Sequence, residues 1–200
     1  PEARQEARRR LGVEKELVLG SVGHLSEQKG LIYLLRALRG VLRRYPQARL
    51  FLFGRGPLEG TLRRQAKALG LSEAVRFMGL REPMEDYYPA FDLFVLPSLW
   101  EGCPYSLLEA MSFGVPTVGT RVVGIVDAVQ HGESGWLVPP RDAEALERAI
   151  EELLGDAPRR QRLGQGARRR IAKHFLQEHF LERMARLYRS LWRQKAPMEP

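Results

Sequence analysis

The feature that most constrains this chain is an alternation of two kinds of segment. Runs rich in aliphatic, β-branched and aromatic residues occupy residues 17–23, 48–54, 75–80, 93–98, 116–120 and 135–139, and segments with apolar residues at helical spacing lie between them. A strand followed by a helix, repeated in this way, is typical of a parallel sheet, and nearly continuous apolar strands indicate helices on both faces. The sequence therefore predicts an α/β fold, a Rossmann-like doubly wound parallel six-stranded sheet with right-handed crossovers.

Three further helical stretches, at residues 142–154, 158–174 and 176–193, follow the sixth run. The last one carries an apolar stripe made of Phe180, Leu181, Met184, Leu187, Tyr188, Leu191 and Trp192. Such a stripe ordinarily belongs to the core, and the alternative is that it docks onto a surface outside these residues. Because the sequence contains no internal repeat, low-complexity tract or flexible linker, we expect residues 1–200 to form a single domain.

Composition narrows the class of protein. With 200 residues, 44% of them hydrophobic, the chain is long enough to form a stable core without disulfides or metal. Its single cysteine excludes an internal disulfide and a cysteine-rich zinc site. No apolar run approaches the roughly 18 residues of a membrane span, and the first residues read as a charged helix rather than a signal peptide. We therefore expect a cytoplasmic protein.

The charge balance favours anionic partners. The chain has 32 Lys and Arg against 24 Asp and Glu, a net charge of +8, which suits phosphates, nucleic acid or an acidic membrane surface. The arginine-rich run at residues 159–170 could serve a nucleic-acid-binding module, but it has no interleaved aromatic residues for base stacking. We interpret it as a solvated helix face, with no nucleic acid as partner, and keep a peripheral contact with an anionic membrane as an alternative.

Ligands of an open parallel sheet bind beyond the carboxyl ends of the strands, so the loops there are the candidate sites. The first such loop runs from Gly23 to Gly30 and contains His24 and Lys29. Its glycines, a helix N-terminus and a lysine together suit a phosphate or diphosphate. The alternative is a surface turn with solvated side chains.

The second loop, Gly54-Arg55-Gly56-Pro57 with Gly60, is close to a dinucleotide fingerprint but does not match it. The third glycine falls one position late, and no acidic residue follows the next strand to hold a ribose hydroxyl. NAD binding is therefore disfavoured. A tight strand-to-helix turn with Pro57 at the helix start explains these residues equally well.

The loop after the fourth strand is the most informative. Pro104 is expected in the first helical turn, which leaves the amides of residues 103–107 partly unpaired. Glu101 in the loop and Glu109 in the helix can then reach one cleft, where carboxylates suit the hydroxyls of a sugar or ribose. The alternative is that both are ordinary partners of the helix dipole. Cys103 is expected to be a small, partly buried apolar residue.

The segment PSLWEGCPYSLLEAMSFGVPTV, with seven residues between Glu101 and Glu109, resembles the signature of family-4 retaining glycosyltransferases of GT-B architecture. The motifs GHLSEQKG, FGRGP, VRFMGL, FDLFVLPS and ESGWLVPPRD are similar to those of the family and follow in the same order, from about residue 17 to residue 155. The helices after residue 158 also look like the C-terminal segment of the family. Five motifs in order make this resemblance specific.

The resemblance implies a domain that binds a nucleotide-diphosphate sugar as donor substrate, with no cofactor and no metal. Lys29 would neutralise the diphosphate, Glu109 would hold the ribose, and Glu101 would hold the transferred sugar. Amides of residues 102–105 would contact the sugar, those of residues 106 and 107 the phosphate, and backbone near residues 80 and 81 the base. The implied donor-binding residues are His24, Lys29, Gly54, Leu80, Arg81, Glu101, Gly102, Cys103, Pro104, Tyr105, Ser106, Leu107 and Glu109, with Lys29 and Glu101 catalytic.

The resemblance also implies retention of anomeric configuration and a second, N-terminal domain that binds the acceptor and is not among these residues. In this fold the last helix crosses back to that domain, so Tyr188, Leu191 and Trp192 are expected to be partly exposed. A sugar-nucleotide epimerase or a glycogen-synthase-like enzyme would share the architecture. An enzyme that glycosylates lipid-linked acceptors would fit a contact with the inner membrane face. His24 stands where the family usually has Arg, so donor binding could depend on pH or on Arg55.

Overall fold

The computed structural model describes residues 2–195. Its six strands all pair in parallel, in the order β3-β2-β1-β4-β5-β6. They are β1 (Leu17–Val22), β2 (Ala48–Phe53), β3 (Val75–Gly79), β4 (Leu93–Leu96), β5 (Thr117–Thr120) and β6 (Trp136–Val138). The predicted six-stranded parallel sheet is confirmed. Its strand order reverses between β1 and β4, which is the topological switch point of the sheet.

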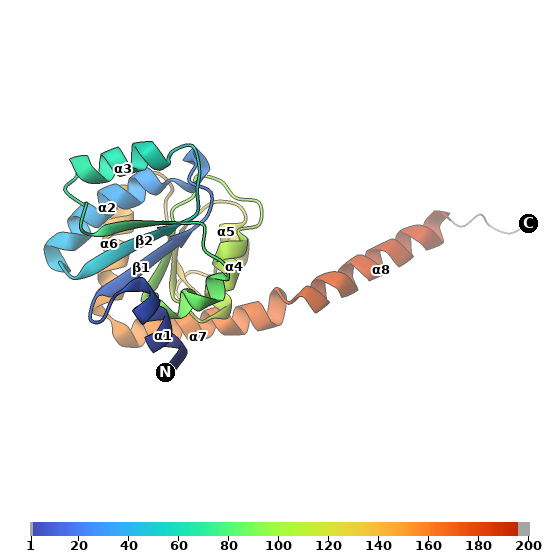
Figure 1. Ribbon diagram of the computed structural model, residues 1–200. Helices are drawn as coiled ribbons and strands as arrows, with labels where there is room; N and C mark the ends of the chain where they lie inside the picture. The colour runs from blue at the N-terminus through green and yellow to red at the C-terminus, as the bar shows by residue number, and fades with distance from the viewer. Residues whose placement is uncertain (1, 196–200) are drawn as a thin grey trace, which may run out of the picture.

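Helices cover both faces of the sheet, and the chain ends in the long helix α8 (Figure 1). The α-helices are α1 (Glu2–Leu11), α2 (Leu31–Arg44), α3 (Glu59–Ala68), α4 (Tyr105–Ser112), α5 (Ile125–Ala128), α6 (Ala143–Gly155), α7 (Ala157–His174) and α8 (Gln177–Lys195). Three short 3₁₀ helices are η1 (Glu27–Lys29), η2 (Met84–Asp86) and η3 (Tyr88–Ala90). The predicted helices after β6 are therefore present.

Two hydrophobic cores lie on the two faces of the sheet, because successive residues of a strand point to opposite sides. On β2, Leu50 and Leu52 enter a mainly aliphatic core against α2, α3 and α6. Phe51 and Phe53 enter the other core, which contains residues of α1, α4, α5 and α7. Strands buried on both faces explain why these runs are almost continuously apolar.

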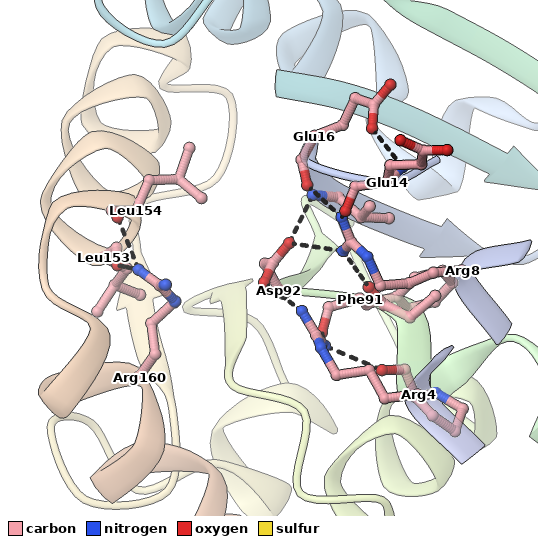
Figure 2. Close-up of polar contacts among 12 residues, drawn as sticks. Arg4, Arg8, Glu14, Glu16, Phe91, Asp92, Leu153, Leu154 and Arg160 are labelled. Atoms are coloured by element: carbon pink, nitrogen blue, oxygen red, sulfur yellow. Dashed lines mark hydrogen bonds and ion pairs between the residues drawn. The ribbon is translucent and has the colours of Figure 1, made fainter. Parts of the chain in front are cut away.

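At the amino ends of the strands, Asp92 connects β1, β4 and α1 (Figure 2). Its carboxylate accepts hydrogen bonds from the Val18 amide at 2.8 Å and from Nη2 of Arg4 at 2.6 Å. Arg8 lies 3.5 Å from the same carboxylate and donates to the Glu16 carbonyl at 2.7 Å. These contacts fix α1 at the edge of the sheet opposite to the loops predicted to bind ligand.

The interpretation of residues 159–170 as a solvated helix face is wrong for Arg160 and Arg170, which are half-buried, whereas Arg168 is exposed as expected. Polar contacts nevertheless involve all three, Arg160, Arg168 and Arg170. These α7 side chains donate to carbonyls at the ends of α6, α4 and α5 respectively, and Figure 2 shows the contact with α6. Carbonyls of a last helical turn lack intrahelical donors and carry partial negative charge, so a guanidinium suits them. The acceptors are Leu153 and Leu154 (2.6 and 2.7 Å), Phe113 (3.0 Å), and Asp127 and Ala128 (2.7 and 2.6 Å).

The apolar stripe of α8 does not join either core. The helix leaves the body of the domain after α7 (Figure 1), and Tyr188, Leu191 and Trp192 are 65%, 46% and 79% exposed. The prediction of a core helix is therefore wrong within the described residues, and the expected exposure of these three side chains is confirmed. Within residues 2–195, no helix combines the length and the apolar character needed to cross a bilayer.

Candidate functional site

The loops that follow β1 and β4 lie side by side at the switch point, because β1 and β4 are neighbours in the sheet. The loop after β1 leads into η1, which ends at Lys29. The loop after β4 runs through Glu101 to Pro104, the N-cap of α4. Two loops that come from distant parts of the sequence thus meet at the position where open α/β sheets bind ligands.

Lys29 and Glu101 form a direct ion pair between these two loops. The Lys29 Nζ lies 2.5 Å from Glu101 Oε1, and their side chains are only 13% and 4% exposed. Ser98, which is fully buried, donates its hydroxyl to the same carboxylate oxygen at 2.7 Å, and Gln28 Nε2 lies 3.3 Å from Oε2. Three donors therefore stabilise one buried carboxylate, which meets the requirement that a buried charge be paired.

Backbone contacts hold the two loops together. The Leu99 amide donates to the Gln28 carbonyl at 2.7 Å, and Gln28 Nε2 donates to the Trp100 carbonyl at 3.1 Å. The Thr120 hydroxyl at the end of β5 donates to the Ser98 carbonyl. The position of Glu101 is thus fixed from β1, β4 and β5. Sequence reasoning missed Gln28, Ser98 and Thr120 as supporting residues.

Gly54 lies where the loops after β1 and β2 touch. Its φ is +120°, and a Cβ at this position would lie 2.0 Å from the Gly23 carbonyl oxygen. Both facts require glycine, so close packing of the loops explains this residue without a bound ligand. The prediction that Pro57 starts the following helix is wrong by two residues, because α3 begins at Glu59.

The start of α4 differs in three details from the prediction. Pro104 is the N-cap rather than a residue of the first turn, and the Leu107 amide donates to the Pro104 carbonyl at 3.0 Å. The Leu107 amide is therefore not among the free ones, whereas Tyr105 and Ser106, the first two residues of α4, have no intrahelical acceptor. Cys103 is exposed rather than partly buried, and Tyr105 is 73% exposed.

Glu109 has a different partner from Glu101. The hydroxyl of Tyr88, in η3, donates to Glu109 Oε2 at 2.7 Å. Burial of the phenol, followed by its hydrogen bond to Glu109 and the charge of that carboxylate, raises the pKa of Tyr88 well above its usual value of 10. Tyr88 was not predicted from the sequence. A cleft shared by the two glutamates stays a prediction.

The other predicted donor residues lie at the same edge of the sheet, since parallel strands all end there. His24 is exposed in the loop after β1, and Leu80 and Arg81 are exposed directly after β3, with Leu80 60% accessible. Gly102, also exposed, follows Glu101. Among residues 2–195, no three His, Cys, Asp or Glu side chains form a group that could hold a metal ion.

The strand order and the charge pair at the switch point define a doubly wound, Rossmann-like α/β domain, a class whose ligands bind beyond the carboxyl ends of the strands at that point. Residues 3–170 match the family described as "Glycosyl transferases group 1", so the chain belongs to this glycosyltransferase family, whose architecture is GT-B.

The chain is similar to proteins about twice its length. It is 36% identical over 200 residues to a D-inositol 3-phosphate glycosyltransferase of Corynebacterium urealyticum, covering 94% of this chain and 47% of that relative. Among solved structures, Anabaena HepE in complex with UDP has a TM-score of 0.88 and 26% identity, with 95% of this chain and 53% of HepE covered. A sucrose-phosphate synthase from Thermosynechococcus elongatus has a TM-score of 0.86 and 30% identity, with 96% and 49% covered. The chain thus spans about half the length of these proteins.

Proposed function

We propose that this chain binds a nucleotide-diphosphate sugar and presents it for retaining, metal-independent transfer to a hydroxyl acceptor. The observation that carries the proposal is the Lys29–Glu101 pair, which joins the loops after β1 and β4 at the switch point. The UDP and UDP-glucose complexes of Anabaena HepE support it, because that protein has the same fold over 95% of this chain.

In this proposal the diphosphate lies between Lys29 and the N-terminus of α4. The ammonium supplies a positive charge, and the free amides of Tyr105 and Ser106 supply hydrogen-bond donors with the positive end of the helix dipole behind them. His24 adds a third donor from the loop after β1. These groups stabilise the negative charge that develops on the diphosphate as it leaves, which is the task that a metal ion performs in other enzymes.

The two carboxylates recognise the two sugars of the donor. Glu109, which keeps one oxygen bonded to Tyr88, accepts hydrogen bonds from the ribose hydroxyls. Glu101 and the amides of Gly102 and Cys103 hold the transferred sugar, and backbone near Leu80 and Arg81 contacts the base. Lys29 contacts Glu101 before any ligand binds. In the proposed complex, the phosphate of the nucleotide sugar therefore meets an ammonium group that also contacts the sugar-binding carboxylate.

In the proposed transfer step, atoms and electrons are conserved without a cofactor. The bond from the anomeric carbon to the diphosphate oxygen breaks, and its electron pair stays on the diphosphate. The acceptor oxygen bonds to the same carbon from the face that the diphosphate leaves, and the acceptor proton passes to a departing phosphate oxygen. Configuration is therefore retained, and Lys29 stabilises the product diphosphate.

The whole activity requires a second domain in addition to this one. An N-terminal GT-B domain would bind the acceptor and form the other wall of the cleft. The exposed apolar face of α8 suits a contact with that domain, because Trp192 at 79% and Tyr188 at 65% exposure leave a large apolar area in water. The chain alone is therefore expected to bind donor without transferring sugar.

Calorimetric titration with UDP-glucose, GDP-mannose and ADP-glucose tests the proposal. We expect one of them to bind, and Glu109→Ala to abolish binding without a change in the far-UV circular dichroism. Lys29→Ala should also abolish binding, and Lys67→Ala, at an exposed position on α3, is its matched control. A folded wild type that binds none of the three nucleotide sugars, or variants that bind as the wild type does, would contradict the proposal.

A further inference from the structure

Tyr88 connects the second core to the candidate site. Its ring is 1% exposed and packs against Phe113 and Phe91, with ring centroids 5.6 and 5.8 Å away. Its hydroxyl contacts α4 at two points: Glu109 Oε2 at 2.7 Å and the Ser106 carbonyl oxygen at 3.3 Å. A rigid ring anchored in the core therefore holds its only polar atom against one face of α4.

The hydroxyl acts as a permanent donor to Glu109. A phenol has one proton, and the shorter contact is the one to the carboxylate. Burial and the neighbouring carboxylate raise the pKa of Tyr88, so the hydroxyl is protonated at neutral pH. Oxygen Oε2 of Glu109 thus already accepts one hydrogen bond from the protein. Within the described part of the chain, Oε1 has no hydrogen-bond partner and is the oxygen left for a ligand.

We propose that Tyr88 is a positioning residue for donor binding: its hydroxyl fixes the Glu109 carboxylate so that Oε1 meets the ribose diol of the nucleotide. This inference rests on the proposed function. A glutamate side chain has three rotatable bonds, and a carboxylate held by a buried donor has lost most of that freedom before the ligand arrives.

The test compares Tyr88→Phe, which removes one oxygen and keeps the buried ring, with the wild type. Calorimetry measures the affinities for UDP, GDP and ADP and for their 2′-deoxy analogues. For the nucleotide that binds, we expect Tyr88→Phe to weaken the ribonucleotide about tenfold and the 2′-deoxy analogue clearly less, because the analogue offers the positioned carboxylate only one of the two hydroxyls. In a Glu109→Gln background the added effect of Tyr88→Phe should be small, since the two residues act as one unit.

Tyr87→Phe is the matched control, because it removes the hydroxyl of the neighbouring tyrosine, whose ring packs on Phe53 at 5.2 Å. Its affinities should equal those of the wild type. Equal losses for the ribonucleotide and the deoxy analogue would make Tyr88 merely structural and overturn this inference while the proposed function stands. A folded wild type that binds no nucleoside diphosphate would overturn both.

Discussion

The ammonium of Lys29 lies 2.5 Å from a carboxylate oxygen of Glu101, 72 residues further along the chain. The Lys29 ammonium is therefore already paired with an anionic side chain before any ligand binds. Its charge is already shared with a glutamate that Ser98 also contacts, in a place where both side chains are largely removed from water. If the proposed function holds, stability and donor binding therefore depend on the same pair.

Replacing Lys29 alone should destabilise the domain. Lys29→Ala leaves the 4% exposed carboxylate of Glu101 without its cation, although Ser98 and Gln28 still donate to it. The expected loss is about 3 kcal/mol in the free energy of unfolding, measured by urea titration. The double variant Lys29→Met/Glu101→Gln removes both charges and should recover most of it. A loss equal to that of Lys67→Ala would contradict the burial of the pair.

Neutralising Glu101 should strengthen the binding of a bare nucleoside diphosphate. In Glu101→Gln the Lys29 ammonium no longer shares its charge with a carboxylate, so UDP or the preferred nucleotide should bind about tenfold more tightly, roughly 1.4 kcal/mol. The nucleotide sugar should gain less, because Glu101 is its proposed sugar contact. Calorimetry with both ligands measures the difference, and Glu73→Gln, at an exposed position, is the control. Weaker UDP binding in Glu101→Gln would refute the prediction.

Arg170 should contribute to stability through the end of α5. Its Nε and Nη2 donate to the carbonyls of Ala128 and Asp127 at 2.6 and 2.7 Å. Arg170→Ala should cost about 1–3 kcal/mol in urea unfolding, whereas Arg169→Ala, at an exposed neighbouring position, should change stability by less than about 0.5 kcal/mol. Co-sedimentation with phosphatidylserine vesicles should be the same for both variants. A selective loss of sedimentation in Arg170→Ala would instead favour the membrane contact.

His131 should make the domain sensitive to mild acid. Its Nδ1 accepts a hydrogen bond from the Leu137 amide at 3.0 Å, which requires an unprotonated Nδ1. Partial burial, followed by the charges of Arg121 and Arg159, lowers the pKa of His131 below the usual 6.5, and Glu152 opposes this. The unfolded chain then binds more protons than the folded one, so this contribution to stability is complete above pH 6.5 and is lost as the pH falls through the lowered value.

The measurement is urea unfolding at pH 7.5 and pH 5.5. His131→Asn keeps an acceptor near the Leu137 amide and removes the titrating ring, so its stability should fall less between the two pH values than that of the wild type. An equal fall in both proteins would assign the acid sensitivity to other groups.

The sheet could be read from the sequence because burial on both faces leaves a pattern that depends on each strand alone. Such runs predict all six strands and the segments after β1 and β4 that carry Lys29, Glu101 and, on α4, Glu109. The side-chain contacts that support the site could not be predicted from the sequence, because they join residues across the sheet. Tyr88 is 21 residues from Glu109, and Gln28 is 73 residues from Glu101.

Two errors have physical causes that a sequence pattern does not contain. A run of arginines has the same composition whether its guanidinium groups face water or helix ends, and only the placement of α7 beside the last turns of α4, α5 and α6 decides. An amphipathic helix has the same stripe whether its partner lies inside or outside the chain. The stripe of α8 predicted a core helix, and this prediction is wrong because Tyr188 and Trp192 are exposed among the described residues.

The switch-point pairing has a consequence for how the domain reaches its functional state. β1 pairs with β4 over only two residue pairs, Leu19 with Leu93 and Gly20 with Phe94, whereas β1 pairs with β2 over six. The Lys29–Glu101 contact closes a loop of 72 residues across that short junction. Loop closure of this length is entropically costly and is rewarded only when both halves of the sheet are in place. We therefore expect the proposed donor site to form only when both halves of the sheet have assembled, so that ligand-induced protection from amide hydrogen exchange would report on the assembled sheet.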